Sequence, residues 1–376
     1  MRSLFWHRNP YDFEHTKDLF LRHVIDNAVF QFDHCENYRR LLLARGFTRE
    51  HILSIASPSE LPFIPTLYFK HHSLLSVPEN RLKIKATSSG TSGNKSVIGF
   101  DLKSLWAGLG MVLSLGIRHR LFSAVPCHYI ILGYEYNRMA DMAVAKTAYG
   151  YTWFAPALSR TYAMKYENGG YTLQLEHVKQ RLIRLCRQRF PVRIMGFPFH
   201  AHWLLTQMKQ EGIRLTLPAG SMIAFGGGWK QHCSQKADKE TMYRLIHEVL
   251  GIKEENCREF FGAVEHPILY CDCPRHHFHI PIYSRVVIRD VDTLAPVPFG
   301  TPGLVNLITP MVNSAPLVSI MTDDIGILRN DCGCGISSPY LEIMGRVGME
   351  DIVTCAAGAE NLMKTILEGE KANASV

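Results

Sequence analysis

The hydrophobic and polar positions of this chain follow helical spacing in some segments and strand-like runs in others. Residues 13–56 are predicted to be mostly helical and to lead into the turn-prone segment SPSELPFIP. Farther along, CHYIILGY (127–134) predicts a buried strand. One apolar stripe, flanked by a cationic face that we expect to be solvated, predicts a helix through Leu175, Val178, Leu182 and Leu185.

From residue 192 onward, short apolar runs alternate with amphipathic segments. Strands are predicted at 192–197, 221–228 and 258–263, and helices at 199–211 and 235–250. This alternation is typical of an α/β fold built on a mainly parallel sheet. Beyond about residue 280 the helical pattern stops, and YSRVVIRD, GLVNLI and PLVSIM predict a β-rich subdomain.

The pattern contains no repeat of fixed period, which argues against a solenoid. We expect a large domain over 1–345, with 280–345 as its β-rich part. A short carboxy-terminal segment, 346–376, is predicted to end in one helix followed by the tail KANASV.

Composition narrows the class of protein. The 376 residues are 47% hydrophobic and 20% charged, with a net charge of +7 and no run of Lys or Arg, so a globular enzyme is favoured over a nucleic-acid-binding protein. The amino terminus lacks a signal-peptide pattern, and the apolar stretches, such as MVLSLGI, are too short to span a membrane. A cytoplasmic location is therefore expected, where the ten cysteines would be thiols or metal ligands.

A glycine- and hydroxyl-rich segment, TSSGTSGNKS, lies between the strand-like LKIKA and the helix-like LKSLWAGLGMVLSLGI. Its backbone N–H groups and hydroxyls could cradle phosphate oxygens, although an ordinary surface turn has the same composition. A Walker-type loop is disfavoured because Gly90 and Gly93 are too close together and Asn94 precedes Lys95 where that motif has glycine.

Three further motifs follow in a fixed order: FGGGWK (225–230), FFGAVEH (260–266) and MTDDIG (321–326), with a glycine–arginine pair at 345–346. Together with TSSGTSG they resemble the adenylate-forming superfamily of acyl and aryl ligases. More narrowly, these strings, the lead-in IPTLYFK and the strands VVIRD and GLVNLITP resemble the LuxE family of acyl-protein synthetases. The resemblance covers about residues 60–360.

This resemblance implies that ATP activates a carboxylic acid as an acyl adenylate. Lys95 would screen charge beside a phosphate loop made of Ser88, Ser89, Gly90, Thr91, Ser92 and Gly93. The carboxylate of Glu265 would hold Mg²⁺, although a surface glutamate at a strand end is the ordinary alternative.

The remaining nucleotide contacts implied by the resemblance lie in the later motifs. The adenine would lie against Gly226, Gly227 and Gly228, where the alternative is a plain turn. The ribose would bind at Thr322 and Asp323, with Asp324 as a competitor for that role. Arg346 would contact ribose or phosphate, or else serve as a salt-bridge partner.

The carboxy-terminal segment is short, which affects the choice of acyl acceptor. About thirty residues follow Arg346, too few for the carboxy-terminal domain that supplies a catalytic lysine in CoA ligases. The resemblance instead implies capture of the acyl group as a thioester on Cys355, just before an expected helix start that would favour the thiolate, and transfer to a partner reductase or carrier protein. The local string VTCA keeps the family pattern only in part, and a buried structural cysteine is the alternative.

The remaining cysteine pairs predict a second metal. CDCPRHHFH and CGCG lie about sixty residues apart, and Zn²⁺ could be held in a tetrahedral structural site by Cys271, Cys273, Cys332 and Cys334. A histidine of the first string could replace one thiolate if the geometry required it.

Two other functions stay open at this point. One is a ligase that hands the acyl adenylate directly to CoA or a carrier thiol without a covalent enzyme intermediate. The other is a nucleotide-binding or zinc-stabilised interaction module that has lost turnover. The identity of the acid is not constrained by these motifs.

Overall fold

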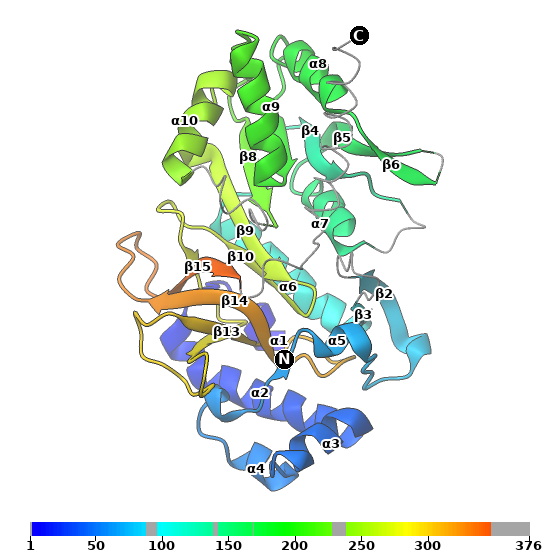
Figure 1. The fold of residues 1–376 in the computed structure, drawn as a ribbon, viewed down its shortest axis with the longest axis vertical. Helices are drawn as coiled ribbons and strands as arrows, with labels where there is room; N and C mark the ends of the chain where they lie inside the picture. Colours follow the sequence, from blue (N-terminus) through cyan, green and yellow to red (C-terminus); the bar gives the residue numbers. More distant parts are fainter. Residues whose placement is uncertain (1, 88–95, 138–141, 168, 228–237, 347–376) are drawn as a thin grey trace. The chain divides into compact units, whose positions relative to one another are not determined.

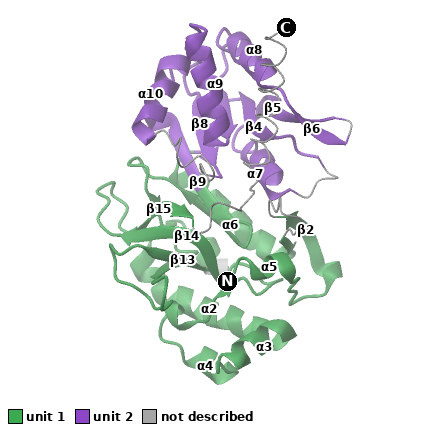
Figure 2. Cartoon of the chain, viewed as in Figure 1, with its two compact units in different colours: residues 1–120, 261–350 green, residues 121–260, 351–376 purple. Residues whose placement is uncertain are grey.

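The computed structural model describes residues 2–87, 96–137, 142–167, 169–227 and 238–346 (Figure 1). The candidate residues 88–95, Gly228 and Cys355 lie outside these ranges. The described chain divides into two compact units (Figure 2). Of the described residues, unit 1 contains those of 1–120 and 261–346, and unit 2 contains those of 121–260.

Unit 1 begins with helices, as the sequence predicts for residues 13–56. These are α1 (Arg2–Phe5), α2 (Phe13–His34), α3 (Glu36–Ala44) and α4 (Arg49–Ser54). They are followed by α5 (Tyr68–His71) and by the longer α6 (Leu102–Arg118). The buried apolar side chains Phe20, Val24 and Ala28 face the interior from α2, at the helical spacing that the sequence shows.

The β-rich part of unit 1 is a sheet in the order β11-β15-β14-β13-β12. Its strands are β11 (Phe278–His279), β12 (Arg285–Arg289), β13 (Gly303–Ile308), β14 (Ser319–Arg329) and β15 (Tyr340–Arg346), and each adjacent pair is antiparallel. The short strand β1 (Ile64–Pro65) pairs with β14 in parallel. The predicted β-rich region after residue 280 is thereby confirmed.

The segment around the glycine- and hydroxyl-rich loop differs from the expectation. Strand β2 (Leu82–Thr87) pairs antiparallel with β3 (Val97–Asp101), and α6 begins only after β3. The loop therefore connects two strands instead of a strand and a helix. The strand VIGFD escaped prediction because it is short and runs directly into the strong helical pattern of α6.

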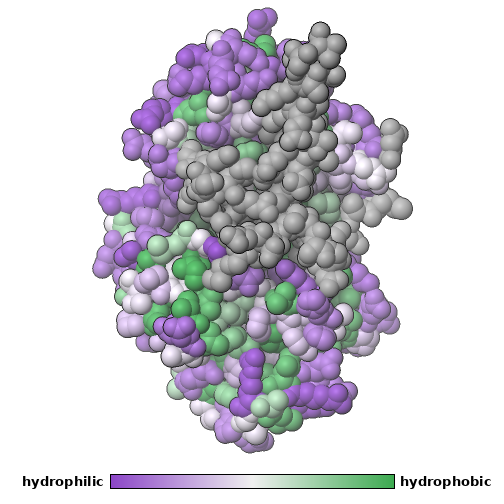
Figure 3. All heavy atoms as spheres, viewed as in Figure 1, coloured by the Kyte–Doolittle hydropathy of each residue, from purple (hydrophilic) through white to green (hydrophobic). Residues whose placement is uncertain are grey.

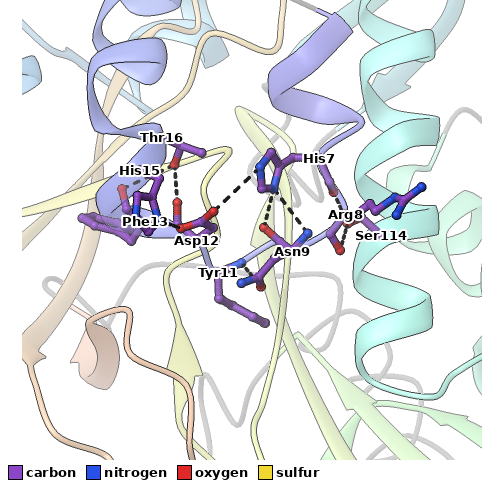
Figure 4. Close-up of polar contacts among 9 residues, drawn as sticks. All are labelled: His7, Arg8, Asn9, Tyr11, Asp12, Phe13, His15, Thr16 and Ser114. Carbon is purple, nitrogen blue, oxygen red and sulfur yellow. Dashed lines mark hydrogen bonds and ion pairs between the residues drawn. The ribbon is translucent and has the colours of Figure 1, made fainter.

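The amino-terminal segment is tied to α6 by polar contacts (Figure 4). Ser114 on α6 donates its hydroxyl hydrogen to the carbonyl oxygen of His7 over 2.7 Å. The hydroxyl of Thr16 donates to the carbonyl oxygen of Asp12 over 2.7 Å at the start of α2. These contacts fix the path of the chain between α1 and α2.

Unit 2 is built on the predicted mainly parallel sheet, which confirms the α/β class. The strands run in the order β10-β9-β8-β7-β4-β5-β6, with β10 and the end of β9 belonging to unit 1. Pairing is parallel from β9 through to β5, and β6 is antiparallel to β5. The strands are β4 (Cys127–Tyr134), β5 (Ala157–Glu167), β6 (Gly170–Leu173), β7 (Val192–Gly196), β8 (Met222–Gly226), β9 (Cys257–Ala263) and β10 (His266–Cys271).

The helices of unit 2 are α7 (Ala143–Tyr151), α8 (Leu175–Leu185), α9 (Pro198–Gln210) and α10 (Lys239–Leu250). The apolar faces of α8, α9 and α10 pack with β4, β7 and β8 in one core that contains Ile130, Leu182, Ile194, Leu204 and Ile246. Ala145 of α7 packs in a separate cluster with Tyr134, Met164 and Phe197. Outward-facing positions are polar, as Figure 3 shows for the mainly hydrophilic surface of α10.

The cationic face of α8 is not solvated throughout, contrary to the expectation. Lys179 is only 6% exposed, and its Nζ lies 2.7 Å from a carboxylate oxygen of Glu176 and 2.8 Å from one of Glu211. Two carboxylates compensate the burial of this ammonium group.

Within the described part of the chain, no helix combines the length and apolar character needed to cross a bilayer.

Candidate active site

The carboxyl ends of the parallel strands in unit 2 form the first candidate region. Ligands of open α/β sheets bind outside this edge. The predicted adenine-binding glycines lie here, because Gly226 is the last residue of β8 and Gly227 follows it. Gly227 has φ +86°, and a Cβ there would lie 3.0 Å from the ring of Phe197.

At Gly226, by contrast, a Cβ would meet no atom of the described residues within 4 Å. At the end of β8, position 227 therefore has a backbone conformation that glycine adopts easily, and position 226 is partly exposed. This arrangement suits the close approach of a flat ring to the backbone.

Glu265 lies in the turn between β9 and β10 of unit 1, and it is only 7% exposed. Among the described residues, no hydrogen bond or ion pair engages its carboxylate. A carboxylate is a hard oxygen donor, so this side chain has the chemistry of a cation ligand.

The predicted ribose-binding residues lie on β14 of unit 1. Arg346 on β15 reaches across, with its Nη2 3.4 Å from Oδ2 of Asp323 and its Nε 3.8 Å from Oδ1 of Asp324. The structure thus brings Asp323 and Arg346 together, and both sequence alternatives for Arg346 remain compatible with this contact.

Thr322 positions this pair instead of presenting its own hydroxyl. Its Oγ1 donates to the carbonyl oxygen of Val305 over 3.1 Å and accepts from the N–H of Asp324 over 3.2 Å. Both interactions fix the backbone of β14 on either side of Asp323.

A supporting network that the motifs did not reveal lies next to β3. Asp101 accepts from the backbone N–H of Ser104 over 2.9 Å, and the Nδ2 of Asn313 donates to its other carboxylate oxygen over 3.2 Å. The hydroxyl of Ser104 in turn accepts from the N–H of Asn313 over 3.0 Å. These bonds hold the strand that follows the predicted phosphate loop against residues 309–314. The only signal in the sequence is an aspartate at a helix start.

Three of the four cysteines in the predicted zinc set converge in unit 1. The ligand atoms of Cys273, Cys332 and Cys334 lie within 4.8 Å of one another together with a ring nitrogen of His279. Cys271 is the last residue of β10 and is not a member of this group; the chain turns at 274–275, after Cys273. His279 is one of three histidines in the string CDCPRHHFH, and the sequence alone does not indicate which of the three would be the ligand.

Comparison with protein families gives one match over nearly the whole chain. The family model described as acyl-protein synthetase, LuxE, matches residues 3–363. The long-chain-fatty-acid–luciferin-component ligase of Vibrio harveyi is 24% identical over 348 residues, which are 91% of this chain and 88% of that protein. The ligase of the same name from Aliivibrio fischeri is 24% identical over 366 residues, covering 94% and 91% of the two chains.

Solved structures with the same fold are adenylate-forming ligases. A 2-hydroxyisobutyryl-CoA ligase in the postadenylation state, in complex with 2-HIB-AMP, superposes with a TM-score of 0.68 at 15% identity, over 90% of this chain and 70% of that one. An open conformation of such a ligase, in complex with 2-HIB-AMP and CoA, gives 0.67 at 16% identity, over 92% and 78% of the two chains. The expected fold is confirmed. With the family model matching nearly every residue, this chain belongs to the LuxE family of acyl-protein synthetases, which are ligases.

Proposed function

We propose that this protein uses ATP to activate a long-chain fatty acid as an acyl adenylate, captures the acyl group on Cys355 and passes it to a partner reductase or carrier protein. The observation that carries the proposal is the family match across residues 3–363, in which the phosphate-loop, glycine, FFGAVEH and TDD motifs stand in order. The acid is inferred from the names of the Vibrio harveyi and Aliivibrio fischeri relatives, which are long-chain-fatty-acid ligases.

In the first step, a carboxylate oxygen of the acid attacks the α-phosphorus of ATP. The bond from that phosphorus to the bridging oxygen breaks, and pyrophosphate leaves with the bonding electrons. Two anions must approach each other, so the protein has to screen negative charge. The N–H and O–H groups of residues 88–93 and the ammonium group of Lys95 are the proposed donors.

Glu265 is the proposed Mg²⁺ ligand. Its carboxylate is a hard oxygen donor, and no described residue bonds to it, so it is available to a cation. When bound, the ion would neutralise charge on the phosphates.

The proposed nucleoside contacts are those of the glycine motif and the TDD motif. Gly226 and Gly227 offer an open backbone surface for the adenine ring. Asp323 would accept hydrogen bonds from the ribose hydroxyls, and its contact with Arg346 orients the carboxylate.

In the second step, the Cys355 thiolate would attack the acyl carbon. The bond between that carbon and the oxygen of AMP breaks, AMP leaves, and a thioester remains on the protein. Transfer to a thiol of the partner would then regenerate the free cysteine.

The test of the first step is pyrophosphate exchange. Labelled pyrophosphate should enter ATP only when a suitable acid is present, because the adenylation step is reversible. A panel of short-, medium- and long-chain fatty acids and aryl acids should show a preference for long-chain fatty acids. Failure of the whole panel would favour a nucleotide-binding module without turnover.

The test of the second step is the variant Cys355→Ser. It should retain acid-dependent exchange and lose the hydroxylamine-sensitive label that a radioactive fatty acid leaves on the protein in the presence of ATP. Cys186→Ser, at the end of α8, is the matched control and should keep the label. Persistent label in Cys355→Ser would refute the thioester at this residue, and label absent even from the wild type would favour direct transfer to CoA or a carrier.

A further inference from the structure

Two segments of unit 1 meet at a cluster of sulfur and nitrogen atoms. One is residues 273–279, between β10 and the end of β11, and the other is residues 332–334, in the connection from β14 to β15. We infer that Cys273, His279, Cys332 and Cys334 form a structural Zn²⁺ site of the Cys₃His type. The inference is independent of the proposed acyl chemistry.

The spacing of the ligand atoms is the first argument. The Sγ atoms of Cys273 and Cys332 are 3.5 Å apart, and the Sγ of Cys334 is 3.2 Å from Nε2 of His279. A disulfide would need a sulfur separation of about 2.0 Å. A tetrahedral zinc ion with bonds of about 2.3 Å to sulfur separates two thiolates by about 3.8 Å. The observed separation of the two sulfur atoms is close to that of two thiolates bound to one zinc ion, and it is much longer than a disulfide bond.

The second argument is the support around the ligands. The Nδ1 of His279 donates to the carbonyl oxygen of Ser338 over 2.7 Å, which leaves the lone pair of Nε2 free to face Cys334. The backbone N–H of Arg275 points to the Sγ of Cys273 over 3.3 Å. Such contacts orient metal-binding side chains in protein sites.

The third argument is burial, because a polar side chain that is removed from water costs free energy unless it is bonded to a partner. Cys273 is 0% exposed, His279 1% and Cys332 4%. Left-handed backbone at Asp331 (φ 60°), Gly333 (φ 70°) and Gly335 (φ 86°) curls the second segment around the cluster. Four protein ligands would complete the tetrahedron and leave no position for a substrate, so the ion would have a structural role.

Two nearby side chains compete for a place in the set, and the geometry disfavours both. The Nδ1 of His277 is 3.1 Å from the Sγ of Cys332, but its ring stacks on Tyr340 at 4.4 Å and does not belong to the mutually close group. The Sγ of Cys271 lies 3.7 Å from the carbonyl oxygen of Asp272, at the end of β10.

The ion would strengthen a weak part of the sheet. Strand β11 is two residues long and pairs with β15 through Phe278–Leu341 and His279–Tyr340 alone. A Zn²⁺ held by both segments would fasten the start of β15, the strand that ends at Arg346. Loss of the ion is therefore expected to loosen this edge of the sheet first.

Metal content of the full-length chain tests the inference. Protein purified without chelators should contain about one zinc per chain by plasma mass spectrometry. Cys334→Ser and His279→Ala should lower this content at least fivefold. Cys271→Ser and His277→Gln are matched controls from the same strings and should keep the wild-type content.

A second readout avoids dependence on variants that fail to fold. Wild-type protein exchanged with Co²⁺ should show the intense visible bands of a tetrahedral ion and the near-ultraviolet thiolate charge-transfer bands. The inference is overturned if the wild type contains no stoichiometric zinc and Co²⁺ gives no tetrahedral spectrum. It is equally overturned if Cys271→Ser loses as much metal as Cys334→Ser. Both measurements are made without ATP or acid, so they stand apart from the test of ligase activity.

Discussion

His266 follows the proposed Mg²⁺ ligand Glu265 and is completely buried. Its Nε2 lies 3.0 Å from the hydroxyl of Tyr270 and 3.1 Å from that of Ser284. Burial lowers the pKa of His266 from 6.5 to about 3, so the imidazole stays neutral in the folded protein at neutral pH. The unfolded chain keeps an ordinary histidine at this position.

This difference predicts a pH dependence of stability. Between pH 6.5 and about 3 the unfolded chain binds a proton at His266 that the folded chain does not, so the free energy of unfolding falls as the pH falls. From pH 7 to pH 5 the loss from this residue is about 2 kcal/mol. Urea denaturation at pH 7 and pH 5 measures this loss. The decrease in free energy of unfolding should be about 2 kcal/mol smaller in His266→Gln than in the wild type.

The exposed His177 on α8 provides the control for this measurement. His177→Gln should lose as much stability between the two pH values as the wild type does. An identical loss in His266→Gln and the wild type would show that His266 becomes protonated in the folded state.

At the scale of elements, α6 depends on its first residues. Asp101 caps the helix through the N–H and hydroxyl of Ser104, at 2.9 and 2.6 Å, and is also bonded to Asn313. It is 8% exposed, so little water can replace these bonds. The cap joins β3, α6 and residues 309–314 in one network within unit 1.

Asp101→Ala is expected to lower the free energy of unfolding by about 2 kcal/mol, at the upper end for an N-cap residue, because it also leaves Asn313 without its acceptor. Thr48→Ala removes the N-cap of α4, where Thr48 accepts from His51 N–H over 3.4 Å at an exposed site. It should cost about 0.5 kcal/mol. Urea denaturation of both variants should show the larger loss in free energy of unfolding for Asp101→Ala. Equal losses in the two variants would contradict this prediction.

Some of the strands and helices could be predicted from the sequence, and others could not. Strands β4, β7 and β8 and helices α8 and α9 were predictable because each has a long apolar run or a clear helical stripe. Strand β3 was hidden by the helix pattern that follows it, and the two-residue β11 carries no periodic signal. Choosing His279 over Cys271 required the turn after β10, a tertiary feature that C-x-C spacing does not specify.

At the scale of the whole molecule, chain order and spatial grouping differ. Unit 1 joins the described residues of 1–120 to those of 261–346, and Asn27 of α2 donates to the carbonyl oxygen of Val312 over 3.0 Å inside it. The amino-terminal helices carried little recognisable motif, yet they support the segment that also binds Asp101. The motif series was readable from the sequence because its chemistry depends on residue type and order, whereas this long-range support depends on packing.

The central claim is that the chain joins a carboxylic acid to AMP, and acid-dependent pyrophosphate exchange tests it most directly when wild type and Glu265→Gln are compared. The wild type should exchange with a long-chain fatty acid. Glu265→Gln should exchange at least about tenfold more slowly, equivalent to about 1.4 kcal/mol at the transition state. Glu255→Gln, an exposed glutamate ten residues earlier, should match the wild type. No acid-dependent exchange in the wild type, or full activity in Glu265→Gln, would contradict the account.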